Sequence, residues 1–218
     1  MSLFRVDASI RTEGSVSRAV ADTVEKSWLA EHPDGTVVRR DLGLRPLPAE
    51  AWSTAVSGIW VPAEERSPAQ VEATALATTV ADEIMGADAY LLAIPLYNFG
   101  IPQHVKAWID LAFTDPRLSS AVPTPLAGRP AALVLVRGGG YGPGTPREGW
   151  DHSAPYLLRV FRDLWGMDIH LTEAELTLAP VRPAMEALRG LAEQSLRDAH
   201  ATAAQHGRRI AGLVKAAA

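Results

Sequence analysis

The feature that most constrains the fold is a regular alternation of short apolar runs with longer amphipathic segments. The predicted strands are residues 3–8, 36–40, 89–95, 130–137 and 167–172. The predicted helices are residues 15–31, 68–86, 101–113, 152–165 and the alanine-rich stretch after Pro183. This alternation predicts an α/β fold, a parallel sheet with helices on both faces. Right-handed crossovers with one reversal give the strand order 2-1-3-4-5.

The chain shows no internal repeat, linker or shift in composition, so we expect a single domain over residues 1–218. Ser15 is the predicted N-cap of the first helix, and Ser67 followed by Pro68 predicts the start of another. Residues 43–67, which include Trp52 and Trp60, are predicted to be irregular. Loops of this length are usually functional or mobile.

Composition and missing motifs exclude several classes of function. A net charge of -4 and a pI near 5.9 argue against nucleic-acid binding. The absence of cysteine excludes disulfides, a thiolate nucleophile and a Cys-ligated metal. The histidines lack metal-ligand spacing, so no metal site is expected, and neither a P-loop nor a G-x-S-x-G motif is present. Charges interrupt the first apolar run and no run could span a bilayer, so we expect a cytoplasmic protein that does not enter a membrane.

The predicted strand order brings the loops after the first, third and fourth strands to one edge of the sheet, where open α/β sheets bind ligands. The first of these loops leads into a helix N-terminus, which favours an anion. It contains Ser9, Ser15, Val16 and Ser17, and its hydroxyl groups suit a terminal phosphate. The alternative is that Ser15 and Ser17 only cap the helix.

The second loop is the most distinctive stretch of the chain. Pro95 and Leu96 lead into Tyr97, Asn98 and Phe99, between a buried strand and a helix. Two flat apolar rings beside an amide that both donates and accepts hydrogen bonds suit a flat heteroaromatic ligand with polar edges. Flavin is the leading candidate, and the alternative is a hydrophobic turn that packs into the core.

The third loop begins at Val136 and Arg137 and continues through Gly138, Gly139 and Gly140. Glycines allow a backbone to approach a flat ring closely, and their N–H groups could donate to its acceptor edge. The alternative is a flexible surface loop. The run does not match G-x-G-x-x-G and does not follow the first strand, which disfavours a dinucleotide site of the Rossmann type.

At these three loops the chain resembles the flavodoxin-like FMN-dependent NADH:quinone reductases and azoreductases. Ser9 with the 15–17 run resembles the phosphate loop of that family, the 96–102 stretch its isoalloxazine loop, and the 136–139 stretch its second ring-contacting loop. Leu96 stands where the family usually has Met, and Val136 where it often has Ser. The insertion at 140–150 is longer and more aromatic than the family norm.

The resemblance implies a flavodoxin-like three-layer sandwich and a homodimer with two active sites at the subunit interface. It implies non-covalent FMN and a ping-pong transfer of electrons from NADH or NADPH to a quinone or an aromatic azo compound. No catalytic acid or base is assigned, and Tyr141 and His152 are the only donors considered. Trp60 and Tyr141 are predicted to line the substrate pocket, and residues 43–67 to pack near the partner's pocket.

Three alternatives stay open from the sequence. One is a flavin reductase of specialised metabolism that acts on a polycyclic quinone or a nitroaromatic compound, favoured by the aromatic loops. The others are a flavodoxin-like electron carrier and a flavin-free binding protein on the same fold. Arg11, Arg18 and Arg147 are the candidates for contact with the 2′-phosphate of NADPH.

Overall fold

The computed structural model describes residues 1–217, with side chains described through Val214. Its centre is one parallel five-stranded sheet in the order β2-β1-β3-β4-β5, which confirms the predicted order. The strands are β1 (Ser2–Asp7), β2 (Thr36–Asp41), β3 (Ala89–Pro95), β4 (Pro130–Val136) and β5 (Asp168–Ala174). The last strand runs two residues beyond its predicted end.

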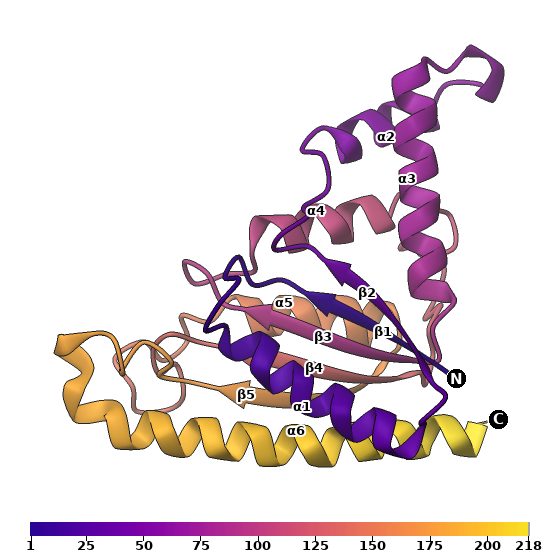
Figure 1. The fold of residues 1–218 in the computed structure, drawn as a ribbon. Coiled ribbons are helices and arrows are strands. Elements are labelled where there is room, and N and C mark those ends of the chain that lie inside the picture. The colour runs from indigo at the N-terminus through magenta and orange to yellow at the C-terminus, as the bar shows by residue number, and fades with distance from the viewer. Residues whose placement is uncertain (218) are drawn as a thin grey trace.

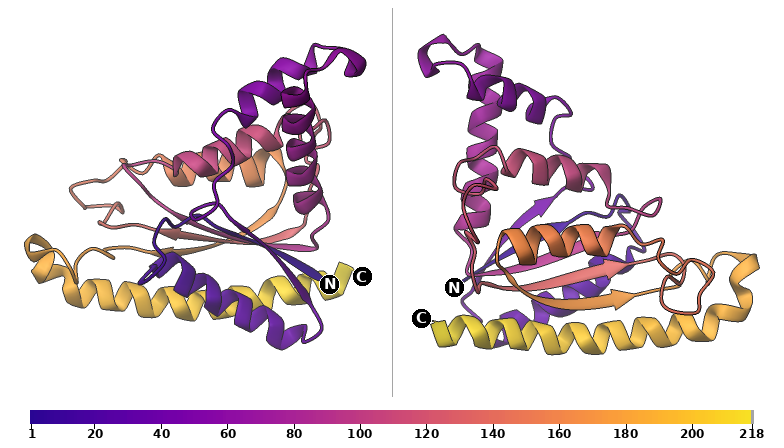
Figure 2. Two further views of the ribbon diagram at one scale, coloured as in Figure 1. Left: turned by 45° about the horizontal axis from the view of Figure 1, so that its top comes forward. Right: turned by 180° about the vertical axis from the view of Figure 1, so that it is seen from behind.

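Helices cover both faces of the sheet, which gives three layers (Figures 1 and 2). One face is covered by α1 (Val16–Glu31) and α6 (Arg189–Ala217). The opposite face is covered by α3 (Pro68–Met85), α4 (Gln103–Ala112), α5 (Ser153–Leu158) and the π-helical η2 (Arg159–Leu164). A short 3-10 segment, η3 (Pro183–Leu188), precedes α6. The predicted helix over 152–165 therefore forms in two parts, α-helical and then π-helical.

The central strands are the most deeply buried elements, and every residue of β3 and β4 is buried. Successive side chains point to opposite faces, so both faces of these strands need an apolar cover. Large side chains such as Leu92 and Leu133 face the layer of α3, α4 and α5. Small ones such as Ala93 and Ala132 face α1 and α6, so those two helices can lie close to the sheet.

The C-terminal helix α6 runs along the whole α1 side of the sheet (Figure 1). Its buried stripe, which includes Ala203, Ile210 and Ala211, completes the apolar cluster on that face. A Cβ at Gly207 would lie 2.4 Å from the Val24 carbonyl oxygen, so the backbones of α1 and α6 are in direct contact there. No helix within the described residues is long and apolar enough to cross a membrane.

Two predicted helix starts are confirmed by their caps. The Ser15 hydroxyl accepts a hydrogen bond from the Arg18 amide at the start of α1. Ser67 and Gln70 form a reciprocal capping box at the start of α3, with Pro68 in its first turn.

The prediction that residues 43–67 are irregular is wrong for part of that stretch. It contains α2 (Ala51–Ile59) and a 3-10 turn, η1 (Ala63–Glu65). The buried face of α2 consists of small residues, Ala51, Ala55 and Gly58, and it packs on α3. Its large apolar side chains are exposed instead. The usual pattern of large residues inside is therefore reversed, and the stretch does not look like an amphipathic helix.

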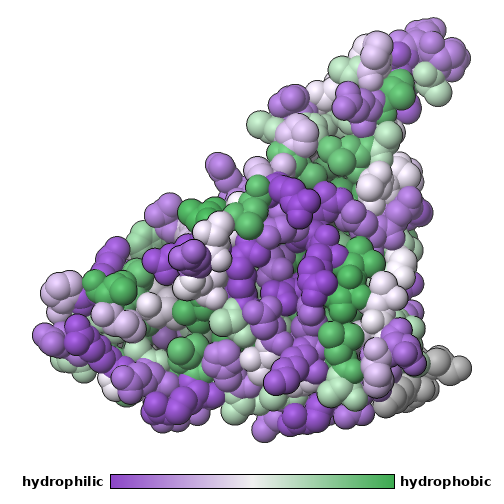
Figure 3. Space-filling view, in the orientation of Figure 1, coloured by the Kyte–Doolittle hydropathy of each residue, from purple (hydrophilic) through white to green (hydrophobic). Residues whose placement is uncertain are grey.

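The helix α2 and the adjoining part of α3 project from the sheet as an arm, defined as residues 51–75 (Figures 1 and 2). Figure 3 shows apolar residues interspersed with polar ones on the arm. Four of its large hydrophobic side chains are exposed: Trp52, Ile59 and Val71 are each about half exposed, and Trp60 is 85% exposed. Monomeric proteins rarely leave such side chains grouped in water.

Candidate functional site

A pocket lies at the carboxyl edge of the sheet, where the predicted loops meet; it is called the edge pocket below. Its volume is about 200 Å³. It is lined by Ser9, Arg11, Ser15, Val16, Ser17, Pro95, Leu96, Tyr97, Val136, Gly138, Thr177 and Leu178. Most of the predicted cofactor-binding positions are therefore brought together. Asn98, Phe99, Arg137, Gly139 and Gly140 stand next to lining residues without lining the pocket themselves.

The phosphate-type loop supplies polar groups that point to an anion. Ser9 and Ser17 are buried, and the Ser15 and Ser17 hydroxyl oxygens lie 3.3 Å apart. The first backbone N–H groups of α1 have no hydrogen-bond partner within the helix, and this end of the helix lines the edge pocket. Arg11 makes no ion pair with any described residue, so its charge is free to act on the pocket. The lining contains no carboxylate, and this combination suits a phosphate.

The position of the phosphate-type loop is fixed by Arg18. Arg18, at the start of α1, donates to the Ser9 carbonyl oxygen at 2.8 Å and pairs with Asp41 at 2.7 Å. Hydrogen bonding to Asp41 raises the pKa of the Arg18 guanidinium, although burial opposes the effect. Arg18 is thus occupied with holding the loop, which leaves Arg11 and Arg147 as the candidates for contact with a 2′-phosphate.

The second loop is a tight turn with an uncommon backbone. Tyr97 and Gly100 exchange two hydrogen bonds of 3.0 Å, and Asn98 and Phe99 between them have φ values of 48° and 70°. Asparagine tolerates this left-handed region, but phenylalanine rarely adopts it. Such strain concentrates at functional sites. The Ile10 amide donates to the Tyr97 hydroxyl at 3.2 Å, so the turn is joined to the phosphate-type loop.

The glycine loop is held against the segment that follows β5. The Leu176 and Leu178 amides donate to the carbonyl oxygens of Gly139 and Gly138, each at 3.2 Å. A Cβ at Gly138 would lie 2.6 Å from a methyl group of Leu178. Thr177 and Leu178 therefore line the edge pocket, and sequence reasoning missed both. The available signal was the strand order, because the loop after β5 ends at the same edge as the loop after β4.

Arg137 needs a correction as a predicted cofactor contact, because its side chain does not line the edge pocket. It lines a second cavity, where it pairs with Asp151 at 2.6 Å, Glu173 at 2.6 Å and Glu175 at 3.4 Å. Burial alone would lower the pKa of the guanidinium, but the hydrogen bond to Glu173 and the neighbouring carboxylate charges raise it. With three acids around it, this side chain offers little positive charge to a ligand. Only the backbone at this position stays a candidate contact.

The 140–150 insertion folds over the strained turn. The Phe99 ring meets the edges of Tyr141 and Trp150 at centroid distances of 6.4 and 5.5 Å. The His152 amide donates to the Phe99 carbonyl oxygen at 2.9 Å, which fixes the far end of the insertion. The insertion borders the second cavity, which Tyr141, Gly142 and Gly149 help to line, and none of its residues lines the edge pocket.

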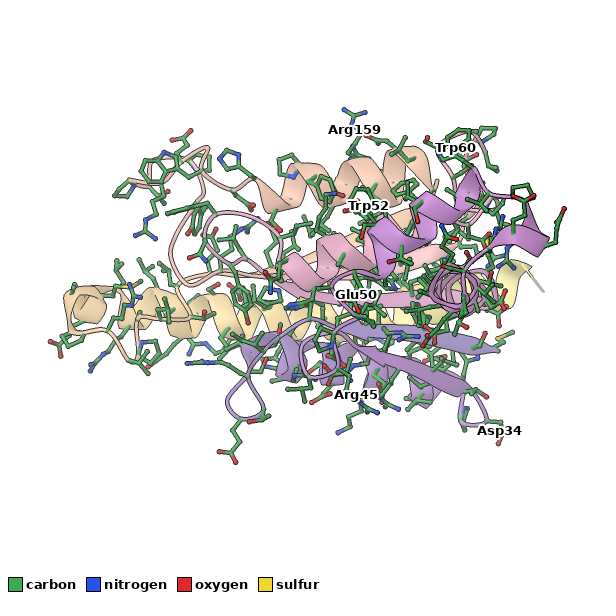
Figure 4. The ribbon with its side chains drawn as sticks, turned by 90° about the horizontal axis from the view of Figure 1, so that it is seen from above. Asp34, Arg45, Glu50, Trp52, Trp60 and Arg159 are labelled. Carbon is green, nitrogen blue, oxygen red and sulfur yellow. The ribbon has the colours of Figure 1, made fainter. Side chains whose placement is uncertain are left out.

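Trp60 does not reach the edge pocket within one chain. It lies at the end of α2, toward the opposite end of the molecule from the loops after β3 and β4 (Figure 4). Its predicted role beside a substrate therefore requires a second subunit and stays a prediction.

A larger cavity, about 570 Å³, lies against β1 and β2. It is the poorer candidate because its charges are mostly satisfied internally. Arg5 pairs with Asp7 at 2.8 Å and with Asp22 at 2.7 Å, and Arg40 pairs with Glu83. Within the described part of the chain, no group of histidine and acidic side chains is arranged to hold a metal ion.

Comparison with known proteins agrees with this geometry. A family model described as a flavodoxin-like fold matches residues 1–197. The FMN-dependent NADH:quinone oxidoreductase of Parafrankia sp. (strain EAN1pec) is 40% identical over 205 residues, which cover 90% of this chain and 97% of that protein. The protein of the same name from Streptomyces avermitilis is 37% identical over 211 residues, with coverages of 96% and 97%.

Solved structures support the fold. The azoreductase from Bacillus anthracis str. Sterne superposes with a TM-score of 0.75 at 22% identity, over 96% of this chain and 99% of that chain. The FMN-dependent NADH-azoreductase from Bacillus anthracis str. Ames Ancestor, solved in complex with FMN, gives a TM-score of 0.76 at 19% identity. Its match covers 97% of this chain and all of that one.

Proposed function

The chain belongs to the flavodoxin-like family that includes the FMN-dependent NADH:quinone oxidoreductases, and from this membership we propose that it transfers electrons from NADH through bound FMN to quinones or aromatic azo compounds. The observation that carries the proposal is the edge pocket, which is lined both by the start of α1 and by Tyr97, the residue that leads into the strained turn. Neither feature is needed to build the sheet.

The pocket residues fit FMN by their chemistry. Ser9, Ser15, Ser17 and the first N–H groups of α1 would hold the phosphate, with Arg11 nearby. Tyr97, Asn98 and Phe99 would hold one side of the ring system. The backbone of Gly138–Gly140 would face the ring from β4. The absence of carboxylates from the lining also favours a dianionic ligand.

When bound, FMN supplies the redox chemistry, because it accepts a hydride from a nicotinamide and passes electrons on. The protein supplies position and surroundings. The turn at 97–100 and the glycine loop are tied to neighbouring segments by backbone hydrogen bonds, so they form a rigid rim for the ring. We propose that NADH and the acceptor occupy the same side of this rim in turn, which gives ping-pong kinetics. Protonation of the product is left to solvent.

The proposed assembly is a homodimer in which the arm of one subunit reaches the site of the other. Its support is the group of exposed apolar side chains on the arm, which nothing in one chain covers. In such a dimer Trp60 would approach the partner's edge pocket, as predicted for the 43–67 stretch.

A visible spectrum of the protein with FMN, before and after anaerobic NADH, tests the proposed function. We expect flavin bands that bleach on NADH and return on addition of a quinone. Asn98→Ala removes the amide from a left-handed position, so FMN retention and the bleaching rate are both expected to fall about tenfold, the loss of one charge-independent hydrogen bond plus backbone strain. Bound flavin that never bleaches would make the protein a carrier, and absence of FMN binding would refute the proposal.

Replacing Trp52 by Asp is expected to weaken dimerisation at least tenfold, because a charge in an apolar contact costs more than about 1.4 kcal/mol. Sedimentation velocity over a range of protein concentrations measures the effect. Val38→Asp is the matched control, because Val38 is an exposed apolar residue on β2, outside both the arm and the edge pocket. A wild-type protein that is monomeric at every concentration, or a Trp52→Asp protein that dimerises normally, would refute the role of the arm.

A further inference from the structure

Four side chains near the glycine loop form a cluster, and three of them have no part in holding the proposed cofactor. Phe99, Tyr141, Arg147 and Trp150 make up this cluster, called the ring platform below. Three of them come from the 140–150 insertion. A loop that only connects β4 to α5 does not require aromatic side chains, so those of the insertion indicate an additional role.

The ring platform presents flat faces to solvent. Phe99 meets Tyr141 at 67° and Trp150 at 76°, so both contacts are of the edge-to-face type and the rings do not stack in parallel. Phe99 is 36% exposed and Trp150 is 51% exposed. Large aromatic side chains are normally buried when nothing stacks on them. The exposed parts of Trp150 and Phe99 are therefore available for contact with a planar ligand.

The platform also holds an unneutralised positive charge. The Arg147 guanidinium lies over the Phe99 ring at 5.7 Å, and its Nη1 donates to the Tyr141 hydroxyl at 3.5 Å. No ion pair joins Arg147 to a described carboxylate. Two acids of the neighbouring segments bind backbone amides: Glu148 accepts from the Gly144 amide at 2.8 Å, and Glu175 accepts from the Tyr141 amide at 3.2 Å.

Arg147 stands close to the proposed reaction site. A Cβ at Gly139 would lie 3.4 Å from its Nη1, so the guanidinium borders the glycine loop. A planar guanidinium next to open aromatic faces is suited to a carboxylate or sulfonate attached directly to an aromatic ring. A nucleotide phosphate fits less well, because a ribose separates it from the nicotinamide ring.

We propose that the ring platform selects the electron acceptor: Trp150 and Phe99 stack on a planar aromatic body, and Arg147 pairs with its carboxylate or sulfonate. The proposal rests on the proposed function, since it names the class of acceptor for the same site. The enzyme then favours anionic aromatic acceptors over neutral ones of the same shape.

The test compares the azo dye methyl red, which carries a carboxylate, with its methyl ester, using protein loaded with FMN. For Arg147→Gln, kcat/KM for methyl red is expected to fall about tenfold, the loss of one charge-assisted hydrogen-bonded pair. The ester is expected to react as before. Arg147→Lys keeps the charge without the planar group, so it should recover part of the loss. Arg208→Gln, an exposed arginine on the C-terminal half of α6, is the matched charge control.

A binding measurement gives a readout independent of turnover. Naphthoate and its uncharged amide are titrated against the oxidised, FMN-loaded protein, and quenching of tryptophan fluorescence is followed. The wild type is expected to bind naphthoate more tightly than the amide, and Arg147→Gln should abolish the difference. Trp150→Leu should weaken both ligands equally, because it removes the stacking surface and leaves the charge.

Two results would overturn the proposal. One is an equal loss of methyl red and ester activity in Arg147→Gln, which would make Arg147 only a support for the insertion. The other is a rise in the KM for NADH or NADPH without a change for the acceptor, which would assign the anion to the nucleotide. In either case normal FMN binding and bleaching by NADH would leave the proposed function intact.

Discussion

Gly43→Ala is expected to lower the affinity for FMN at least tenfold and the free energy of unfolding by roughly 2 kcal/mol, a typical cost of overpacking. Gly43 follows β2 and its backbone lies against the phosphate-type loop. A Cβ there would be 2.0 Å from the Ser9 carbonyl oxygen and 2.5 Å from the Ser9 carbonyl carbon. Both neighbours are backbone atoms, so a rotamer change cannot relieve the clash. Ser9 has to move.

That movement would reach the anion-binding groups directly. The Ser9 carbonyl accepts from Arg18, and the Ser9 hydroxyl accepts from the Arg11 amide at 3.2 Å. Displacing Ser9 therefore disturbs one of the serines proposed to hold the phosphate and the placement of Arg11. The two effects should be of similar size, because a tenfold loss of affinity corresponds to about 1.4 kcal/mol.

Isothermal titration with FMN and denaturant unfolding of the apoprotein measure the two quantities separately. Gly212→Ala is the matched control, since a Cβ at Gly212 in α6 meets no atom within 4 Å. That change should stabilise the protein by up to about 1 kcal/mol and leave FMN affinity alone. If Gly43→Ala bound FMN as the wild type does, the proposed phosphate site would lie elsewhere.

Arg137→Met is expected to lower the free energy of unfolding by about 3 kcal/mol, near the lower end for breaking a buried ion pair. The Arg137 side chain is 8% exposed, and methionine would fill much of its volume while leaving Asp151, Glu173 and Glu175 without their shared cation. The lower end applies because Glu173 is partly exposed and water can solvate it. The acids would then repel one another beside the glycine loop.

Thermal and denaturant unfolding of the apoprotein measure this loss of stability. Titration with FMN shows whether the change also lowers the affinity of the site for FMN. Glu173→Gln is the control, because an exposed partner of an ion pair contributes at most about 1 kcal/mol. We expect FMN affinity to fall with Arg137→Met, since Glu175 also accepts from the Tyr141 amide at the end of the glycine loop. Unchanged stability in Arg137→Met would show that the acids are held by other contacts.

The sheet was predictable because each strand is recognisable from the composition of its own short segment. The runs at 89–95 and 130–137 are apolar throughout, and strands buried on both faces have this composition. Loop positions follow from strand order, so Ser9, Tyr97 and Gly138 could be expected at one edge before any coordinates.

The parts that were not predictable depend on partners distant in sequence. The fate of Arg137 was set by acids up to 38 positions later in the chain, on β5 and beyond it. To predict that Thr177 and Leu178 line the pocket, the end of β5 had to be known. That end was hard to predict because β5 is an edge strand and only partly buried. The helix α2 was hidden because Trp52 faces solvent while alanines face α3.

The position of α6 has a consequence for how the protein is made. One apolar face of the central strands is completed only by α6, the helix from Arg189 to Ala217, which comes later in the chain than all five strands. While that segment is still inside the ribosome, Leu91, Val134 and the buried side of α1 have no cover from it. The nascent chain therefore passes through a stage in which a large apolar surface is exposed, and transiently exposed surfaces of this kind favour aggregation and chaperone binding. A premature stop before α6 removes more than a tail, because it leaves the sheet with one face bare.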